Sequence, residues 1–215
     1  MPEIIADWEE DGRYFTIAKR IPGKPLSEAW ETMSEDQRES VAKETAKFLL
    51  ELREIHSDKI QMLGGKPVYD GFLFRSSHDA PHGPISSDAE LWAELDKALT
   101  DVPLSAREKL RKRMPPAEPY TFTHGDLTHV NIMVEDGHVT GIIDWEGSGF
   151  FPVWWEFAKA GIGLSDTDAE WKALLRKYMP DHAEAREFWQ DLCALSMYPD
   201  LNERGVEFLK GVEGQ

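Results

Sequence analysis

The sequence predicts an α+β fold that is mainly helical and contains short β-hairpins. Two acidic turns, Asp11-Gly12 and Asp136-Gly137, each separate short runs of apolar and β-branched residues, which is the pattern of a hairpin. Residues 34–57 repeat apolar positions with the period of an α-helix, and similar helical segments follow in the last third of the chain. A length of 215 residues suits one domain, or one domain with a small appendage.

The composition excludes several classes of function. A hydrophobic content of 41% and a charged content of 30% are those of a folded globular protein. The formal charge of −16 repels phosphate backbones, so we expect no nucleic acid, but a neutral or cationic small molecule. Cys193 is the only cysteine, which excludes an internal disulfide. We see neither a signal peptide nor a membrane-spanning run, and therefore expect a cytosolic protein without a membrane partner.

The N-terminal segment is expected to form a hairpin followed by a hinge. Two short strands meet at the turn Glu10-Asp11-Gly12 within residues 3–19. Pro22 and Gly23 then interrupt the strand pattern, and Pro25 keeps the following residues extended.

Capping signals place three helices in the middle of the chain. Ser34 with Gln37, Ser87 with Glu90 and Ser105 with Glu108 have capping-box spacing. The inward face of the first helix is predicted to carry Val41, Thr45, Phe48, Leu49, Leu52 and Ile55. Between the first two helices, residues 59–83 have no sustained period, and we expect a long surface loop there.

Residues 122–147 hold the polar groups that point to chemistry. A short β-rich run ends at His124, a polar loop follows, and a hairpin around Asp136-Gly137 returns the chain. Because a hairpin brings its two ends together, Asp126, Asn131 and Asp144 are expected to cluster. Two carboxylates and an amide oxygen suit Mg²⁺, which substrate phosphates then complete. Phosphoryl transfer needs this kind of positioning, together with an acceptor for the nucleophile's proton.

These residues carry a resemblance to a known family. HGDLTHVN fits the H-x-D-x₄-N pattern of kinase catalytic loops, and IIDWE stands in the place of the metal-binding segment. HGD and DWE resemble the aminoglycoside phosphotransferase and choline kinase branch. RYFTIAKRIPGKPL is similar to that family's last small-lobe strand and hinge, and GSGFFPVWWEFAKA to the segment after its metal-binding loop. The resemblance covers most of the chain, from about residue 3 to the C-terminal helices.

The resemblance implies a protein-kinase-like fold and a set of roles. Residues 1–24 would be a remnant small-lobe hairpin and hinge, and residues 25–215 the large lobe. Asp126 would be the catalytic base, His124 would fix the loop backbone, and Asn131 and Asp144 would hold Mg²⁺. Backbone atoms of the hinge, at Lys19, Arg20 and Ile21, would face the adenine of ATP.

Four further residues have two interpretations each. His129 is a loop contact or a group in the substrate cleft, and Glu146 is a ligand of metal or substrate or else a surface acid. Trp154 and Trp155 are core residues or walls of the cleft, since adjacent aromatics on a helix point in different directions.

Only about twenty residues precede the hinge. These residues contain neither a Gly-rich loop nor the strand Lys that binds nucleotide phosphates, which argues against ordinary use of ATP. Three hypotheses therefore follow. The first hypothesis is a Mg²⁺-dependent small-molecule phosphotransferase, with a nucleotide site that is compact or completed by a homo-oligomer. The second is nucleotide-independent acid–base chemistry, such as cyclisation, dehydration or isomerisation, with Asp126 and His124 or His129 moving protons. The third is a non-catalytic, pseudokinase-like binding module.

Overall fold

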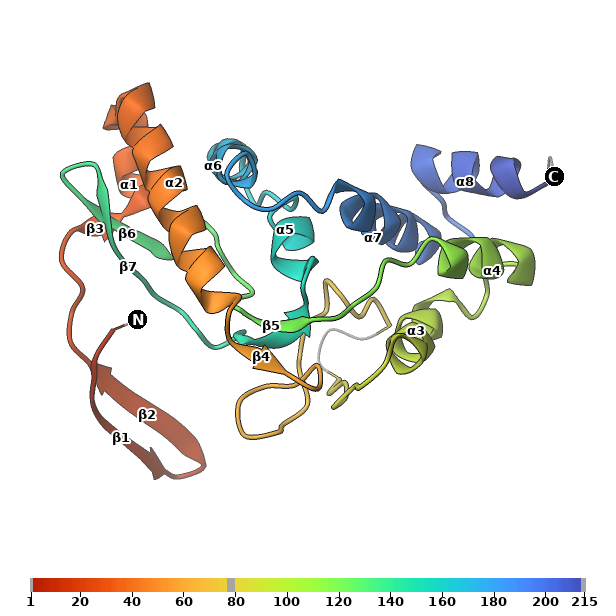
Figure 1. Cartoon of the computed structure of the whole chain (residues 1–215), viewed down its shortest axis with the longest axis horizontal. Coiled ribbons are helices and arrows are strands. Elements are labelled where there is room, and N and C mark those ends of the chain that lie inside the picture. Colours follow the sequence, from red (N-terminus) through yellow and green to blue (C-terminus); the bar gives the residue numbers. More distant parts are fainter. Residues whose placement is uncertain (1, 77–79, 214–215) are drawn as a thin grey trace.

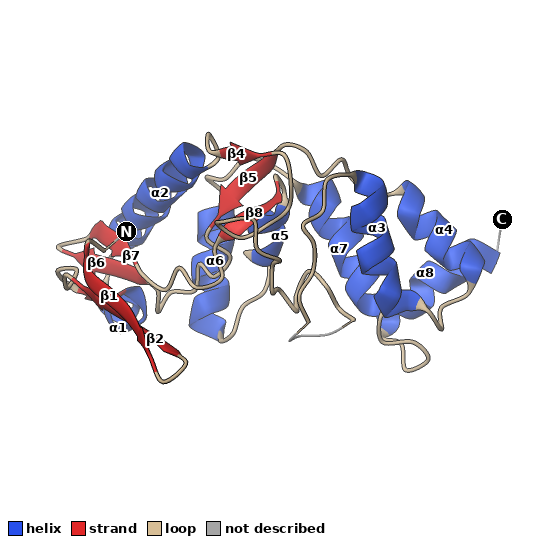
Figure 2. Cartoon of the chain, turned by 90° about the horizontal axis from the view of Figure 1, so that it is seen from below, coloured by secondary structure: helices blue, strands red, loops and turns tan. Residues whose placement is uncertain are grey.

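The computed structural model describes residues 2–76 and 80–213, and its elements confirm a mainly helical α+β protein (Figure 1). The strands are β1 (Ile4–Glu10), β2 (Arg13–Ala18), β3 (Lys24–Pro25), β4 (His56–Ser57), β5 (Tyr120–Thr123), β6 (Ile132–Glu135), β7 (His138–Ile142) and β8 (Gly149–Pro152). The α-helices are α1 (Leu26–Ala29), α2 (Glu35–Leu52), α3 (Asp88–Asp96), α4 (Leu104–Lys112), α5 (Trp155–Lys159), α6 (Asp166–Arg176), α7 (Ala183–Leu195) and α8 (Glu203–Glu213). Figure 2 shows α3, α4, α7 and α8 gathered at one end of the molecule and the hairpins at the other.

The predicted N-terminal hairpin is confirmed. β1 and β2 pair antiparallel, and the turn residues Asp11 and Gly12 have φ values of 51° and 70°, as a two-residue hairpin turn requires. The hairpin stands apart from the rest of the chain (Figure 1). Trp8 and Phe15 face each other across it with ring centroids 5.2 Å apart, yet remain 40% and 38% exposed. Its apolar side is therefore not buried in the protein core.

Two three-stranded sheets make up the rest of the β structure. One has the order β3-β6-β7 and the other β4-β5-β8. The predicted hairpin between β6 and β7 turns at Asp136 and Gly137, with φ values of 52° and 82°. It brings the end of the loop before β6 next to the residues that follow β7.

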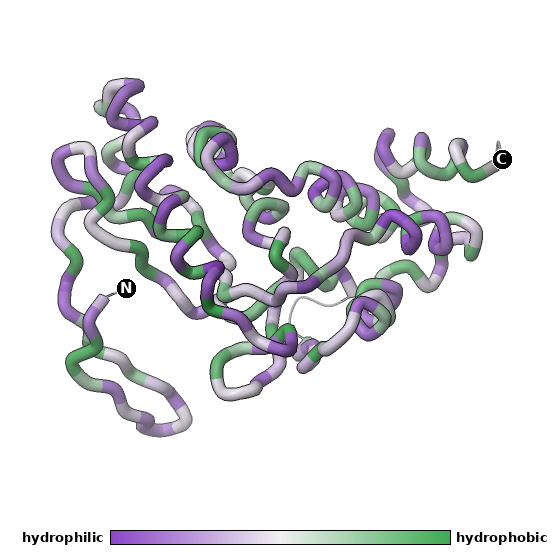
Figure 3. Tube along the Cα trace, viewed as in Figure 1, coloured by the Kyte–Doolittle hydropathy of each residue, from purple (hydrophilic) through white to green (hydrophobic). Residues whose placement is uncertain are grey.

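The long helix α2 begins as predicted. The Ser34 side chain accepts a hydrogen bond from Gln37 N, and the Gln37 side chain accepts one from Ser34 N. Both hydrophilic and hydrophobic residues occur along the helix in Figure 3. The predicted inward face is correct at Val41, Thr45 and Leu49, which are buried.

The same prediction is wrong at Phe48 and Ile55. Phe48 is 43% exposed and Ile55, which lies beyond the helix, is 50% exposed. Both line an open groove with Leu52 and Trp145. This end of the predicted apolar face is therefore not covered by other elements.

The third capping signal is also wrong. α4 begins at Leu104 after Pro103, and no side chain caps it, so Ser105 lies inside its first turn. The fixed φ of proline suits the entry to a helix and allows the turn to start before the serine.

The described part of residues 59–83 contains no helix or strand, so the predicted long loop is confirmed there, but this loop does not lie wholly on the surface. Isolated bridges join Ile60 to Ile85 and Val68 to His82. Ile60, Val68, Leu73 and Phe74 are each 0% exposed, so the segment contributes core residues without regular periodicity. Residues 77–79 of the predicted loop lie outside the described residues.

The buried residues form two hydrophobic clusters. One lies among α3, α4, α5 and α7 and the other beside α2, β6 and α6. Within residues 2–76 and 80–213, no helix has the length and apolar character to cross a membrane.

Candidate active site

The loop after β5 lies very close to the backbone of the segment that contains Gly147. All of β5 is buried, and Gly125 follows with a φ of 83°. A Cβ atom on Gly125 would lie 2.8 Å from Gly147 O, closer than such atoms pack. Glycine at this position therefore lets the loop before Asp126 lie against the segment after Asp144.

His124 ties these two segments together. It is 0% exposed; its Nδ1 accepts a hydrogen bond from Asp126 N at 3.1 Å, so Nε2 carries the proton and donates to Ile143 O at 3.0 Å. Burial lowers the pKa of His124, in keeping with this neutral tautomer. Both ring nitrogens are thus occupied by backbone, which supports the loop-fixing role and leaves no nitrogen for a substrate proton.

Asp126 and Asn131 form the polar end of the loop. Asn131 Nδ2 donates to the Asp126 Oδ2 at 2.9 Å and to Asp126 O at 3.0 Å. Asn131 is 5% exposed, and Ile143 N donates to its backbone oxygen at 3.0 Å. Its Oδ1 has no hydrogen-bond partner among the described residues, so this oxygen remains available to a cation.

A cavity of about 270 Å³ brings the predicted acids together. Asp126, Asp144 and Glu146 all line it, and Asp144 is exposed with a φ of 62°. Two cationic side chains, Lys159 and Lys172, line it as well. The cavity therefore combines carboxylates that suit a metal with fixed positive charges.

Glu156 binds the backbone of the loop that precedes Asp126, a role that was not predicted from the sequence. Its carboxylate accepts a hydrogen bond from His124 N at 2.7 Å and a longer one from Gly125 N at 3.3 Å. Burial raises the pKa of Glu156 to about 7, against the lowering effect of these bonds. An acid inside the apolar run VWWEFA is the signal that could have identified it, because a buried carboxylate needs partners.

Lys159 and Asp70 form a second pair that the sequence analysis missed. Lys159 Nζ lies 3.0 Å from Asp70 Oδ2, which also accepts a hydrogen bond from Trp155 Nε1 at 2.9 Å. Asp70 Oδ1 accepts bonds from two backbone amides, of Phe72 and Leu73. The pair holds the Lys159 ammonium at the cavity. No local sequence pattern predicts a contact between residues this far apart in the chain.

His129 does not reach the cavity. Its backbone N donates to Asp168 Oδ1 at 2.9 Å, and its Nε2 lies 3.2 Å from Thr167 Oγ1. Asp168 is 0% exposed and is paired with Lys172 at 3.0 Å. The loop interpretation of His129 therefore agrees with its position against α6.

Trp154 and Trp155 are core residues. They are 1% and 0% exposed, and neither lines a described cavity. Their burial does not support the interpretation as walls of a substrate cleft.

The hinge residues lie on the edge of the β6–β7 hairpin. Thr140 Oγ1 donates to Pro22 O at 2.7 Å, and Ile21 packs on Gly141, where a Cβ atom would lie 2.5 Å from its side chain. Lys19 N is bonded to Glu3 O at 2.8 Å, while Arg20 is exposed.

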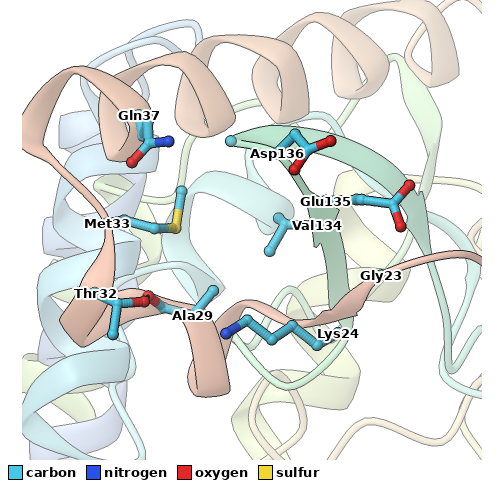
Figure 4. Close-up of a pocket in the computed structure, with 10 residues that line it drawn as sticks. Gly23, Lys24, Ala29, Thr32, Met33, Gln37, Val134, Glu135 and Asp136 are labelled. Carbon is cyan, nitrogen blue, oxygen red and sulfur yellow. The ribbon is translucent and has the colours of Figure 1, made fainter.

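A larger cavity of about 420 Å³ lies beside the turn of this hairpin, at Asp136 and Gly137 (Figure 4). Lys24, Thr32, Met33 and Gln37 surround it. Neither Asp126 nor Asp144 lines this larger cavity, so the volume of a cavity does not identify the candidate site.

Comparisons with known proteins agree with this architecture. A family model described as the phosphotransferase enzyme family matches residues 1–188. An aminoglycoside 3'-phosphotransferase of Enterococcus faecalis is 38% identical over 74 residues, which make up 33% of this chain and 26% of that protein. The match thus spans about a quarter of the relative's length.

Solved structures show the same fold. A streptomycin–ATP complex of APH(2")-IIa has a TM-score of 0.51 at 17% identity, covering 100% of this chain and 73% of that one. APH(4)-Ia has a TM-score of 0.57 at 15% identity, covering 100% and 74%. The predicted protein-kinase-like fold is therefore confirmed, and the family match over residues 1–188 shows that this chain belongs to the phosphotransferase enzyme family.

Proposed function

We propose that this protein is a Mg²⁺-dependent phosphotransferase that transfers a phosphoryl group from ATP to a hydroxyl of a small molecule. The observation that carries the proposal is the joint position of Asp126 and Asp144 in one cavity of about 270 Å³. The loop that presents Asp126 is fixed by His124 from one side and by Glu156 from below.

Each residue has one task in this proposal. Asp126, whose Oδ2 is oriented by Asn131, accepts the proton of the substrate hydroxyl. The hydroxyl oxygen bonds to the γ-phosphorus, the bond from that phosphorus to the β–γ bridging oxygen breaks, and ADP leaves. Asn131 and Asp144 supply an amide oxygen and a carboxylate, which fit Mg²⁺. When bound, Mg²⁺ supplies positive charge against the phosphate oxygens.

The remaining expectations are part of the same proposal. Residues 1–24 act as the small-lobe hairpin and hinge, and the hinge backbone at Lys19–Ile21 contacts the adenine. The structural neighbours hold ATP or ADP with streptomycin or hygromycin B, which supports a hydroxylated small molecule as acceptor. The acid–base hypothesis gains no support from the two histidines, because both ring nitrogens of His124 are bonded to backbone and His129 does not line the cavity of Asp126.

Nucleotide binding and turnover test the proposal separately. We expect Mg²⁺-ATP to stabilise the protein by about 3 kcal/mol at a hundredfold excess over Kd, with little effect when Mg²⁺ is removed. Asp144→Asn should weaken the Mg²⁺-dependent part of this stabilisation. Asp126→Asn should keep it but lower ADP release from Mg²⁺-ATP by about 10²–10⁴-fold.

Thermal unfolding with and without Mg²⁺-ATP measures the first quantity, and an assay of ADP release measures the second. Glu207→Gln, an exposed substitution on α8, serves as control. No binding at millimolar nucleotide, or full ADP release by Asp126→Asn, would contradict the proposal.

A further inference from the structure

The cavity that holds Asp126 adjoins a second one. A cavity of about 410 Å³ lies beside it, and Phe72 and Ile162 line both. These two residues therefore lie between the acids of the loop and the surface of α7. Lys159 Nζ lies 5.2 Å from the centroid of the Phe72 ring, so Phe72 is next to the Asp70–Lys159 pair.

The wall of the second cavity is apolar with a cationic end. Trp189, Ala194 and Met197 supply apolar surface, and Arg75 and Arg204 supply two guanidinium groups. Among the described residues no carboxylate lines this cavity. Its local charge is thus opposite to the formal charge of −16 of the whole chain.

The two arginines are not equivalent. Arg204 is paired with Asp191 and Glu187, each at 2.6 Å, so its charge is already matched. Arg75 has no ion pair or hydrogen bond to any residue within 2–76 and 80–213, and its Nε is buried without a partner. The Arg75 charge on this cavity wall is therefore unmatched among these residues, and an anionic group of a ligand would supply the missing partner.

We propose that the phosphoryl acceptor is a hydroxy acid whose carboxylate is bound by Arg75. The proposal rests on the proposed phosphotransferase function. The substrate hydroxyl lies at Asp126, its apolar body passes between Phe72 and Ile162, and its carboxylate meets the guanidinium, whose planar fork matches two carboxylate oxygens. Contact inside a cavity outweighs the repulsion from distant surface acids, because salt screens those over about 10 Å.

The test compares acceptors that share one skeleton and differ in charge. We would use para-(hydroxymethyl)benzoate and ω-hydroxy fatty acids of graded length, each with its neutral amide and its cationic amine counterpart. The measured quantity is ADP release with Mg²⁺-ATP above the rate of ATP hydrolysis without an acceptor. We expect at least one acid to stimulate ADP release, with a lower KM than its amide and its amine.

Arg75→Gln should raise the KM for that acid by about 10- to 100-fold and leave the amide, the KM for ATP and basal hydrolysis unchanged. Arg75→Lys should restore part of the loss, since it keeps the charge but not the fork. Arg111→Gln, an exposed arginine on α4, is the matched control and should behave as wild type.

Direct binding separates this inference from the proposed function. The same acids should raise the melting temperature of the wild type without nucleotide, and Arg75→Gln should abolish that shift. Preference for the amine or amide, or an equal response of wild type and Arg75→Gln to the acids, would overturn the assignment even if ATP is hydrolysed. Absence of nucleotide binding with an Arg75-dependent shift would instead reject only the phosphotransferase function.

Discussion

Glu156→Gln is expected to change how the stability of this protein depends on pH. The Glu156 carboxyl is buried beneath the loop that carries Asp126, and burial raises its pKa to about 7 from an ordinary value of 4.5. Gln keeps the shape and one acceptor oxygen, so the bond from His124 N, 2.7 Å in the wild type, can persist. The substitution therefore removes the titration with little change in packing.

The sign and size of the effect follow from the two pKa values. Between pH 4.5 and 7 the folded protein keeps the Glu156 proton while the unfolded chain releases it, so stability falls as pH rises. The stabilisation is fully present below the unfolded value and is lost as pH rises through the folded one. A difference of 7 − 4.5 = 2.5 units at about 1.4 kcal/mol each gives a change of about 3 kcal/mol. Glutamine has no proton to release in this range, so the variant lacks this contribution.

Urea unfolding followed by tryptophan fluorescence measures the effect between about pH 4 and 8. The free energy of unfolding of Glu156→Gln minus that of wild type should rise by about 3 kcal/mol over this range. Glu207→Gln, which removes an exposed carboxylate on α8, should run parallel to wild type. If Glu156→Gln also runs parallel to wild type, the reasoning about burial is refuted.

Two further substitutions test contacts that stabilise the fold. Asp168→Ala leaves the Lys172 ammonium buried without its partner at 3.0 Å and should destabilise the protein by about 3–5 kcal/mol in urea unfolding; a loss below about 1 kcal/mol would show that the pair contributes little. Ser34→Ala removes the side-chain cap of α2 and should cost about 1 kcal/mol in thermal unfolding, while Ser105→Ala, inside α4 without a capping role, should be close to neutral.

Local signals predicted the parts of the fold that depend on neighbouring residues. The Asp-Gly turns gave the β1–β2 and β6–β7 hairpins, because few residues adopt positive φ at both turn positions. The capping box at Ser34 gave the start of α2. The spacing of the loop motif placed Asp126, Asn131 and Asp144 in one region, and hydrogen bonds between Asn131, Asp126 and the segment before Asp144 agree with that clustering.

Features that depend on contacts between residues far apart in the chain could not be predicted from local sequence patterns. Ile60 and Val68, which are buried, form bridges to Ile85 and His82, and no periodic pattern in the segment predicts these pairings. Trp154 and Trp155 were expected to point in different directions because they are adjacent on a helix. Both are nevertheless buried, because this segment packs against α7. Asp70 meets Lys159 only because α5 lies over the segment after β4, which local patterns do not encode.

The backbone link between the two acid-bearing segments bears on how a ligand meets the site. His124 Nε2 donates to Ile143 O, and Ile143 N donates to Asn131 O, so hydrogen bonds link the two segments directly. Folding itself therefore brings Asp126, Asn131 and Asp144 to one region. A binding site that is formed in every folded molecule keeps its full affinity, whereas a site that is formed only part of the time loses affinity in proportion to that fraction. The links through His124 and Ile143 thus favour a site that needs no rearrangement of these three residues to meet a ligand.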